Sequence, residues 1–192
     1  MISPVFTASL MKWGAIPDGP ELETPSSWLL PVRLSSAPAM LKVFKPDCDE
    51  QNGRDYLKYL DGHGAVRVLA FDDASLLMER AVGTRSLVAM ALGSEDIEAA
   101  GILASTITRL HANRTRPFPR SLTPLDRRFE SLFARAAEHS LLNLSASVAA
   151  SLLATQRDVL PLHGDLHHAN VLDGGARGGL AIDPKGVIGE RT

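Results

Sequence analysis

A polar segment near the end of the sequence carries the residue types best suited to chemistry. LHGDLHHAN (162–170) contains three histidines together with Asp165 and Asn170. A carboxylate can accept a proton from an attacking hydroxyl group, and an amide oxygen is a hard ligand of the kind that Mg²⁺ prefers. The segment is therefore compatible with a metal site, a site of phosphoryl transfer, or a polar loop that satisfies its own hydrogen bonds.

The residues after this segment predict a turn that brings a second carboxylate back beside it. GGARGG (174–179) is typical of a turn, and VLD and LAID on either side of it have the composition of short strands. A symmetric hairpin would place Asp183 opposite Asn170, at the spacing of about 4.5–5.5 Å found between cross-strand partners. We therefore expect Asp165, Asn170 and Asp183 to converge. The four residues between Asp165 and Asn170 also match the spacing of a kinase catalytic loop.

Other interpretations use the same residues. A zinc site could be formed by His163, His167 and His168, but adjacent histidines on an extended segment point in opposite directions and no cysteine accompanies them. Asp165 and Asp183 could be the carboxylate pair of a glycosidase or of a metal-dependent hydrolase. The segment could also be a polar turn. GGARGG precedes a strand rather than a helix, which favours a hairpin turn over a phosphate-binding loop.

The first part of the sequence predicts strands. AMLKVF (39–44), VRVLAF and SLLMER (75–80) are short apolar segments with charges interspersed, typical of half-buried strands. The residues FDDA between the last two segments favour a hairpin. A short helix is expected within DEQNGRDYLKYL, ending near Gly62.

The second part predicts helices. Ser94, followed by two acidic residues, is expected to cap the first helix, and Thr123-Pro124 to start the second. A third is predicted over about 145–157, and each carries an apolar stripe expected to face the core. We therefore expect an α+β fold, with a strand-rich lobe over 1–81 and a helical lobe over 82–192.

Composition excludes several classes of protein. Hydrophobic residues make up 45% and charged residues 22% of the 192-residue chain, and the net charge of −2 gives no broad basic surface for nucleic acid. A single cysteine, Cys48, excludes an internal disulfide and fits a reducing compartment. No apolar run approaches the roughly 18 residues that span a bilayer, and the N-terminus lacks the pattern of a signal peptide. We therefore expect a cytoplasmic protein without membrane or nucleic-acid partners.

LHGDLHHANVL and LAIDPKGVIGE together resemble the aminoglycoside phosphotransferases. The combination of HGD-x-x-x-x-N with a strand-ending aspartate carries the resemblance, and IDPKGVIGE is similar to the group of streptomycin 6-kinases and hydroxyurea-resistance kinases. This resemblance implies a bilobal protein-kinase-like fold. It also implies transfer of the γ-phosphoryl group of ATP, with Mg²⁺, to an alcohol group of a sugar-like acceptor such as streptomycin.

The resemblance implies roles for the residues of the polar segment. Asp165 would be the catalytic base, and His163 would orient its loop from behind. Asn170 and Asp183 would be the Mg²⁺ ligands. Most of the catalytic effect would then come from positioning and charge neutralisation.

Roles in the first lobe are implied by the same resemblance. Lys42 in LKVFKP would contact the α- and β-phosphates, and Glu50 in the following helix would pair with it. Backbone groups from Glu79 to Ala81 would contact the adenine ring.

The sequence departs from the family pattern in two places. The expected phosphate loop, ETPSSWLLPVRL, contains no glycine, so Ser26, Ser27 and backbone N–H groups would have to cover the phosphates. Kinases of this type also continue well past the metal-binding aspartate, so we expect the C-terminal lobe to be incomplete. An apolar surface left exposed there would favour self-association. The alternative function is then an inactive nucleotide-binding module.

Overall fold

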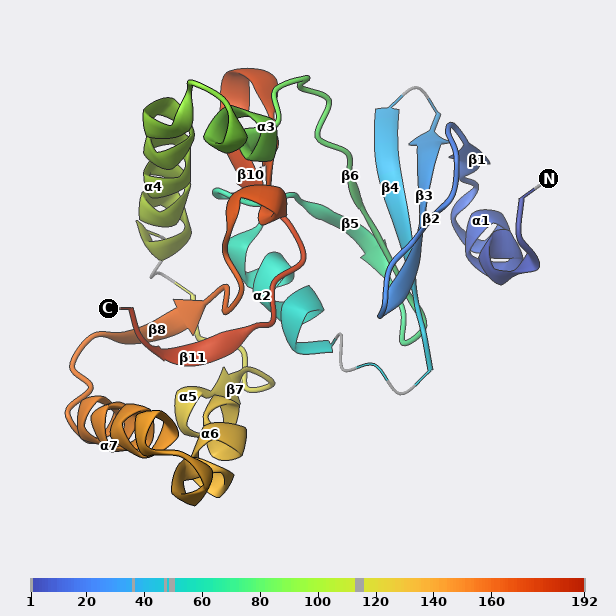
Figure 1. The fold of residues 1–192 in the computed structure, drawn as a ribbon. Helices are drawn as coiled ribbons and strands as arrows, with labels where there is room; N and C mark the ends of the chain where they lie inside the picture. The colour runs from blue at the N-terminus through green and yellow to red at the C-terminus, as the bar shows by residue number, and fades with distance from the viewer. Residues whose placement is uncertain (1, 36, 47, 49–50, 113–115, 192) are drawn as a thin grey trace.

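The computed structural model describes residues 2–35, 37–46, 48, 51–112 and 116–191, and Figure 1 shows a sheet of early strands beside a helical region. The antiparallel sheet has the order β1-β3-β4-β6-β5, with β2 paired to β3. Its strands are β1 (Ile16–Pro17), β2 (Leu22–Glu23), β3 (Ser27–Leu34), β4 (Ala37–Phe44), β5 (Val68–Phe71) and β6 (Ser75–Glu79). The predicted strands of the first lobe and the β5–β6 hairpin are therefore confirmed.

Alternation along β4 gives the sheet two different faces. Leu41 and Val43 belong to a core with Phe6, which lies in η1 (Pro4–Phe6) just before α1 (Thr7–Trp13). Met40 and Lys42 point to the other side, where α2 (Gln51–Leu60) packs beneath the sheet. Successive side chains of a strand face opposite ways, so the lysine lies on the side away from the α1 core.

The second region is built from helices and two small sheets. Its helical elements are α3 (Leu87–Leu92), α4 (Asp96–Ala112), α5 (Leu125–Arg128), α6 (Glu130–Ala134), η2 (Ala136–Glu138), α7 (Ser140–Ala154), η3 (His168–Asn170) and η4 (Gly175–Arg177). Its strands are β7 (Thr123–Pro124), β8 (Val159–Leu162), β9 (Val171–Asp173), β10 (Gly179–Ala181) and β11 (Val187–Glu190). Strands β9 and β10 form a hairpin, and β11 lies between β7 and β8. None of the helices in the described residues combines the length and the apolar character needed to cross a membrane.

The predicted start of the second helix is wrong. Thr123 and Pro124 form strand β7, paired in parallel with β11, and the Thr123 N–H donates to the Gly186 carbonyl at 3.0 Å. The helix begins only at Leu125, and it breaks at Phe129. Pairing with a segment far along the chain has here overridden a local helix-start signal.

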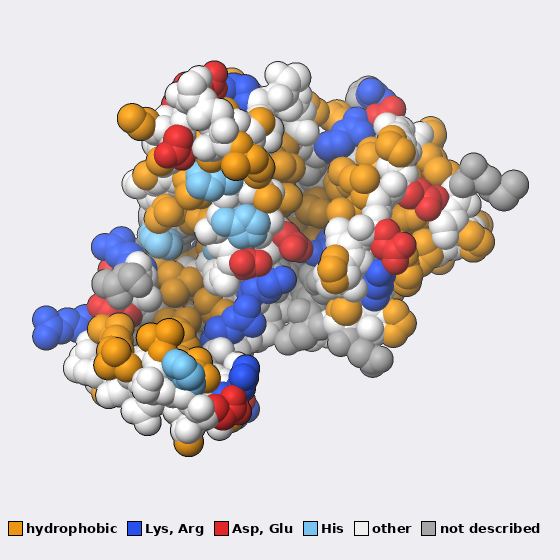
Figure 2. All heavy atoms as spheres, viewed as in Figure 1, with side chains coloured by type: hydrophobic (Ala, Val, Ile, Leu, Met, Phe, Trp, Pro, Cys, Tyr) orange, Lys and Arg blue, Asp and Glu red, His pale blue; other side chains and the backbone are white. Residues whose placement is uncertain are grey.

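The apolar stripe expected on the third helix does not face the core. Helix α7 buries Ala146 and Ala149, whereas Val148 is 50% and Leu152 60% exposed. Hydrophobic side chains are accordingly visible on the surface of the lower part of the molecule in Figure 2, where Figure 1 places α7. Periodicity correctly predicted a helix here but could not predict which face would be covered.

The predicted register of the β9–β10 hairpin is wrong by one residue. Val171 pairs with Ala181, and the Ile182 N–H donates to the Asn170 carbonyl at 2.9 Å, so Ile182 rather than Asp183 aligns with Asn170. The turn closes earlier than expected, because the Gly174 N–H donates to the Gly178 carbonyl at 2.8 Å. Asp183 still reaches the same cavity because its backbone adopts a left-handed conformation with φ of 54°.

Helix α2 and the loop after β10 touch through their backbones. A Cβ atom added to Gly53 would lie 2.2 Å from the Pro184 carbonyl oxygen, and one added to Gly186 would lie 2.3 Å from that of Asn52. Glycine is needed where backbone approaches backbone this closely. The two glycines therefore set the position of α2 against the loop that carries Asp183.

We predict that Gly53→Ala destabilises the protein although alanine favours helices. The added methyl group must displace Pro184, at a cost of about 1–3 kcal/mol that exceeds the gain in helix propensity. The matched control is Gly101→Ala in α4, where an added Cβ meets open space and should stabilise by about 0.5–1 kcal/mol. Urea unfolding of both variants measures the effects; a Gly53→Ala variant as stable as Gly101→Ala would contradict the prediction.

Candidate active site

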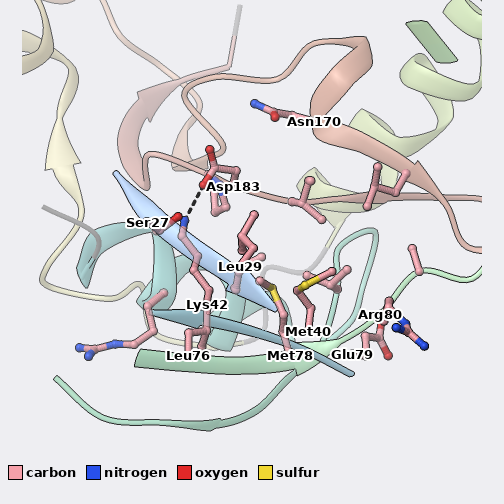
Figure 3. Close-up of a pocket in the computed structure, with 18 of the residues that line it drawn as sticks. Ser27, Leu29, Met40, Lys42, Leu76, Met78, Glu79, Arg80, Asn170 and Asp183 are labelled. Atoms are coloured by element: carbon pink, nitrogen blue, oxygen red, sulfur yellow. Dashed lines mark hydrogen bonds and ion pairs between the residues drawn. The ribbon is translucent and has the colours of Figure 1, made fainter. Parts of the chain in front are cut away.

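A cavity of about 310 Å³ lies between the first sheet and the β9–β10 hairpin. Figure 3 shows Ser27, Lys42 and Asp183 at one end, and Met40 and Met78 toward the other. The apolar lining comprises Leu22, Leu29, Met40, Phe44, Leu57, Val66, Leu76, Met78, Ala81, Leu172, Ile182 and Pro184. The cavity therefore suits a ligand with a flat apolar group at one end and a charged group at the other.

An ion pair between Lys42 and Asp183 joins the two regions at the polar end. Lys42 is buried on β4, and its Nζ donates to Asp183 Oδ1 at 2.6 Å (Figure 3). Burial opposes ionisation of Asp183, but the charge and hydrogen bond of Lys42, together with the charge of Lys185, hold the pKa of this carboxyl below its usual value of 3.8. Asp183 is therefore ionised at neutral pH and available as an oxygen ligand.

His163 braces the loop that carries Asp165. Its Nδ1 accepts from the Asp165 N–H at 3.3 Å, so its Nε2 donates to the Ile182 carbonyl at 2.8 Å. Burial lowers the pKa of His163 to about 4 despite this hydrogen bond, and the Tyr56 ring meets it edge-on with centroids 6.2 Å apart. The imidazole is therefore neutral, and it connects the start of the loop to the strand before Asp183.

The same loop fixes the orientation of the Asn170 amide. Asn170 is buried at the C-terminal end of η3, and its Nδ2 donates to the Asp165 carbonyl at 2.8 Å. This bond leaves the amide oxygen for the cavity, which Asn170 lines together with Asp183. A carboxylate and an amide oxygen are hard donors, so the pair fits Mg²⁺.

Asp165 lies at the rim of this arrangement rather than in the cavity wall. Its side chain is exposed to solvent, and it is not among the described residues that line the cavity. This exposed carboxylate is accessible to a second molecule that arrives from solvent.

The three histidines of the segment are not arranged around one metal position. Both ring nitrogens of His163 are engaged by backbone groups, and His167 Nδ1 accepts from the Ala169 N–H at 3.3 Å. Across the described ranges, no group of three or more His, Cys, Asp or Glu residues could hold a metal ion.

The turn between β2 and β3 covers the polar end of the cavity. Ser27 is buried and lines the cavity, and its Oγ lies 2.9 Å from Thr24 Oγ1, a lining residue that the sequence did not reveal. Ser26 is not part of the lining, although its carbonyl accepts from the Lys45 N–H at 2.9 Å. A polar threonine before a Pro-Ser turn is the signal that could have identified Thr24.

The apolar end is closed by the segment after β6. Glu79 and Ala81 both line the cavity, but the Glu79 N–H already donates to the Arg67 carbonyl at 2.9 Å. Within the described part of the chain, the Ala81 N–H has no such acceptor, so it is the better donor for a ligand. Glu50, expected to pair with Lys42, lies outside the described residues.

The site combines a lysine on a strand, bonded to an aspartate, with an Asp–Asn loop and a half-apolar cavity. Together with the order of the elements, these features define a protein of the protein-kinase-like fold. The solved structure of a choline/ethanolamine kinase family protein from Mesorhizobium loti shows the same fold, with a TM-score of 0.63 and 16% identity over 96% of this chain and 66% of that one.

Sequence comparison gives the family. Residues 12–192 match the family described as aminoglycoside/hydroxyurea antibiotic resistance kinase, and the chain belongs to this family. It is 53% identical to a streptomycin 3''-kinase of Klebsiella pneumoniae over 94% of this chain and 67% of that protein. It is 33% identical to a streptomycin 6-kinase of Streptomyces glaucescens over 97% of this chain and 63% of that protein. The chain thus spans between 56% and 67% of the length of its curated relatives.

We predict that His163 makes the protein less stable as the pH falls from 6.5 toward 4. The unfolded chain gains a proton on this histidine near its usual pKa of 6.5, whereas burial keeps the folded histidine neutral until about 4. Between pH 7 and 5 the cost is about 2 kcal/mol. Urea unfolding at both pH values should show this loss in the wild type and a smaller one in His163→Gln, with the exposed His167→Gln as control. An equal loss in all three proteins would contradict the assignment.

Proposed function

We propose that this chain is an ATP-dependent phosphotransferase that transfers the γ-phosphoryl group to an alcohol group of a streptomycin-type aminoglycoside. The observation that carries the proposal is the 2.6 Å ion pair between Lys42 and Asp183 at the polar end of the cavity. The nucleotide lies between a lobe of residues 1–81 and a lobe of residues 82–192. Its adenine ring occupies the apolar end, near the N–H of Ala81.

The residues at the polar end divide the work of phosphoryl transfer. Lys42 contacts the nucleotide phosphates in place of its present bond to Asp183. Ser27 and Thr24, in the turn between β2 and β3, cover the phosphates. Asp183 and the amide oxygen of Asn170 would hold Mg²⁺. When bound, this ion would neutralise charge on the phosphates. Catalysis on this view is mainly electrostatic stabilisation and positioning.

Asp165 acts on the acceptor. Its exposed carboxylate accepts the proton of the acceptor hydroxyl as that oxygen bonds to the phosphorus and ADP leaves in line. His163 orients Asp165 through the backbone hydrogen bond to its N–H. Because His163 is neutral, it adds no positive charge that would weaken Asp165 as a base.

The acceptor is proposed from the relatives. The relatives include a streptomycin 3''-kinase and two streptomycin 6-kinases, together with a hydroxyurea phosphotransferase, so streptomycin is the first compound to test and the phosphorylated position should be determined on the product. Because the chain spans only part of these proteins, the alternative is a nucleotide-binding module without transferase activity. Calorimetry with Mg²⁺-ATP separates the two: nucleotide binding that streptomycin neither changes nor turns over favours the inactive module.

We predict that Asp165→Asn abolishes streptomycin-dependent ATP consumption and leaves nucleotide affinity within about twofold. Amide substitution removes the proton acceptor, and Asp165 does not line the nucleotide cavity. Coupled ADP release and calorimetry measure the two quantities. The matched control is Asp73→Asn, an exposed acid in the β5–β6 turn, which should leave both unchanged. Undiminished turnover in Asp165→Asn would refute the role of this residue as base.

The surface of α7 supports a proposal about the chain in solution. Leu141, Leu144, Val148 and Leu152 form an exposed apolar stripe along this helix, and we predict concentration-dependent self-association through it. Leu144→Gln with Leu152→Gln should shift sedimentation velocity profiles toward the monomer, and unchanged profiles would exclude α7 as the contact. We also propose a cytoplasmic location, because a single cysteine fits a reducing compartment.

A further inference from the structure

The glycine-rich turn between β9 and β10 reaches the opposite wall of the cavity. Arg177, in η4, donates from Nη1 to the Glu79 carboxylate and from Nη2 to the Gly62 carbonyl at 2.7 Å. A weaker contact of 3.4 Å joins Nη2 to the Ala65 carbonyl. One guanidinium group thus connects the turn to the end of β6 and to the segment between α2 and β5.

Arg177 is itself held from the helical side. Arg109 of α4 donates from Nη1 to the Arg177 carbonyl and from Nη2 to the Gly179 carbonyl, both at 2.5 Å. The Gly178 backbone between them has a φ of 69°, a conformation that glycine adopts readily. The turn is therefore fixed from behind, so Arg177 is anchored to α4 rather than free to follow β6.

A second contact holds the chain just beyond β6 to the same hairpin. The Asp173 carbonyl accepts from the Gly83 N–H at 3.0 Å, and its carboxylate accepts from the Arg85 N–H at 3.1 Å. A Cβ atom on Gly83 would lie 2.1 Å from the Asp173 carboxyl carbon, so this approach requires glycine. The hairpin therefore holds the segment that contains Ala81 at Glu79 before it and at Gly83 after it.

These contacts span the apolar end of the cavity. The hairpin and the residue after it supply Leu172 and Ile182 to one wall, while Met78, Glu79 and Ala81 form the other. A flat ring bound there touches both walls, so its affinity depends on the distance between them.

We propose that Arg177 is a positioning residue for nucleotide binding, which sets the width of the apolar end by tying the hairpin turn to Glu79. The proposal rests on the proposed function in that the ligand is a nucleotide. Loss of the guanidinium lets the end of β6 move away from the hairpin and weakens binding of the base. The phosphates and the transfer step, at the other end, are unaffected.

The test compares Arg177→Gln, Arg177→Lys and Glu79→Gln with the matched control Arg116→Gln. Arg116 is similarly exposed and forms a 2.9 Å ion pair with Asp61 outside this cavity. Hydrogen exchange without nucleotide should be faster over 79–85 in Arg177→Gln and in Glu79→Gln, and unchanged in Arg116→Gln. Affinity for Mg²⁺-ATP by calorimetry should fall about fivefold in Arg177→Gln, which also raises KM without lowering kcat. Arg177→Lys should recover part of the affinity because it keeps one charged donor.

Hydrogen exchange over 79–85 tests the positioning role of Arg177, and affinity for Mg²⁺-ATP in the wild type tests the proposed nucleotide binding. Adding Glu79→Gln to Arg177→Gln should weaken binding no further, because the two residues act through one contact. Unchanged exchange over 79–85 in Arg177→Gln overturns the positioning role, whether or not the chain binds nucleotide. Normal nucleotide affinity in this variant overturns it as well. Absence of Mg²⁺-ATP binding by the wild type overturns the proposed function, while the exchange comparison still decides whether Arg177 holds the end of β6.

Discussion

The arrangement of this site depends on one backbone contact, between α2 and the loop of residues 183–186. Gly53 and Gly186 let the two main chains approach to a distance that no side chain would permit. The loop is also held by other backbone hydrogen bonds. The N–H groups of Lys185 and Gly186 donate to the His163 carbonyl, and the Gly186 carbonyl accepts from the Thr123 N–H. The left-handed conformation of Asp183, unfavourable by roughly 1–2 kcal/mol for such a residue, persists because its neighbours are fixed in this way.

Electrostatics at the polar end follow from this packing. Lys42 is buried on β4 and pairs with Asp183, the partner that the loop presents to it. A buried charge without a partner would cost several kcal/mol, so the ion pair also ties the first sheet to the second region. His163 beside them is kept neutral by burial, which leaves its two nitrogens as one donor and one acceptor for the backbone.

Local patterns predicted the elements that carry the site better than their alignment. AMLKVF was recognisable as a strand and the hairpin after Asn170 from its glycines, whereas the choice of Lys42 within that strand came from the family resemblance. The register failed because the ring closed by Gly174 and Gly178 depends on backbone angles within the turn, which several glycines leave open. Thr123-Pro124 was misassigned because its partner strand, β11, comes more than sixty residues later. The exposed apolar stripe on α7 has the same sequence pattern as a buried one, because periodicity shows that a helix has an apolar face but not what covers that face.

The two ends of the cavity are held by different kinds of contact, and this has a consequence for how a ligand is bound. The polar end is fixed by backbone meeting backbone at Gly53 and Gly186, which cannot be adjusted without unpacking α2. The apolar end is held by long side chains, with the side chain of Arg177 40% exposed and that of Glu79 20% exposed, and such contacts are individually weak and easily rearranged. For a nucleotide bound as proposed, backbone contacts would therefore fix the position of the phosphates. Side-chain contacts, which can rearrange, would hold the base. Positional accuracy is needed where a bond is made, whereas a flat ring requires only that two apolar walls remain close.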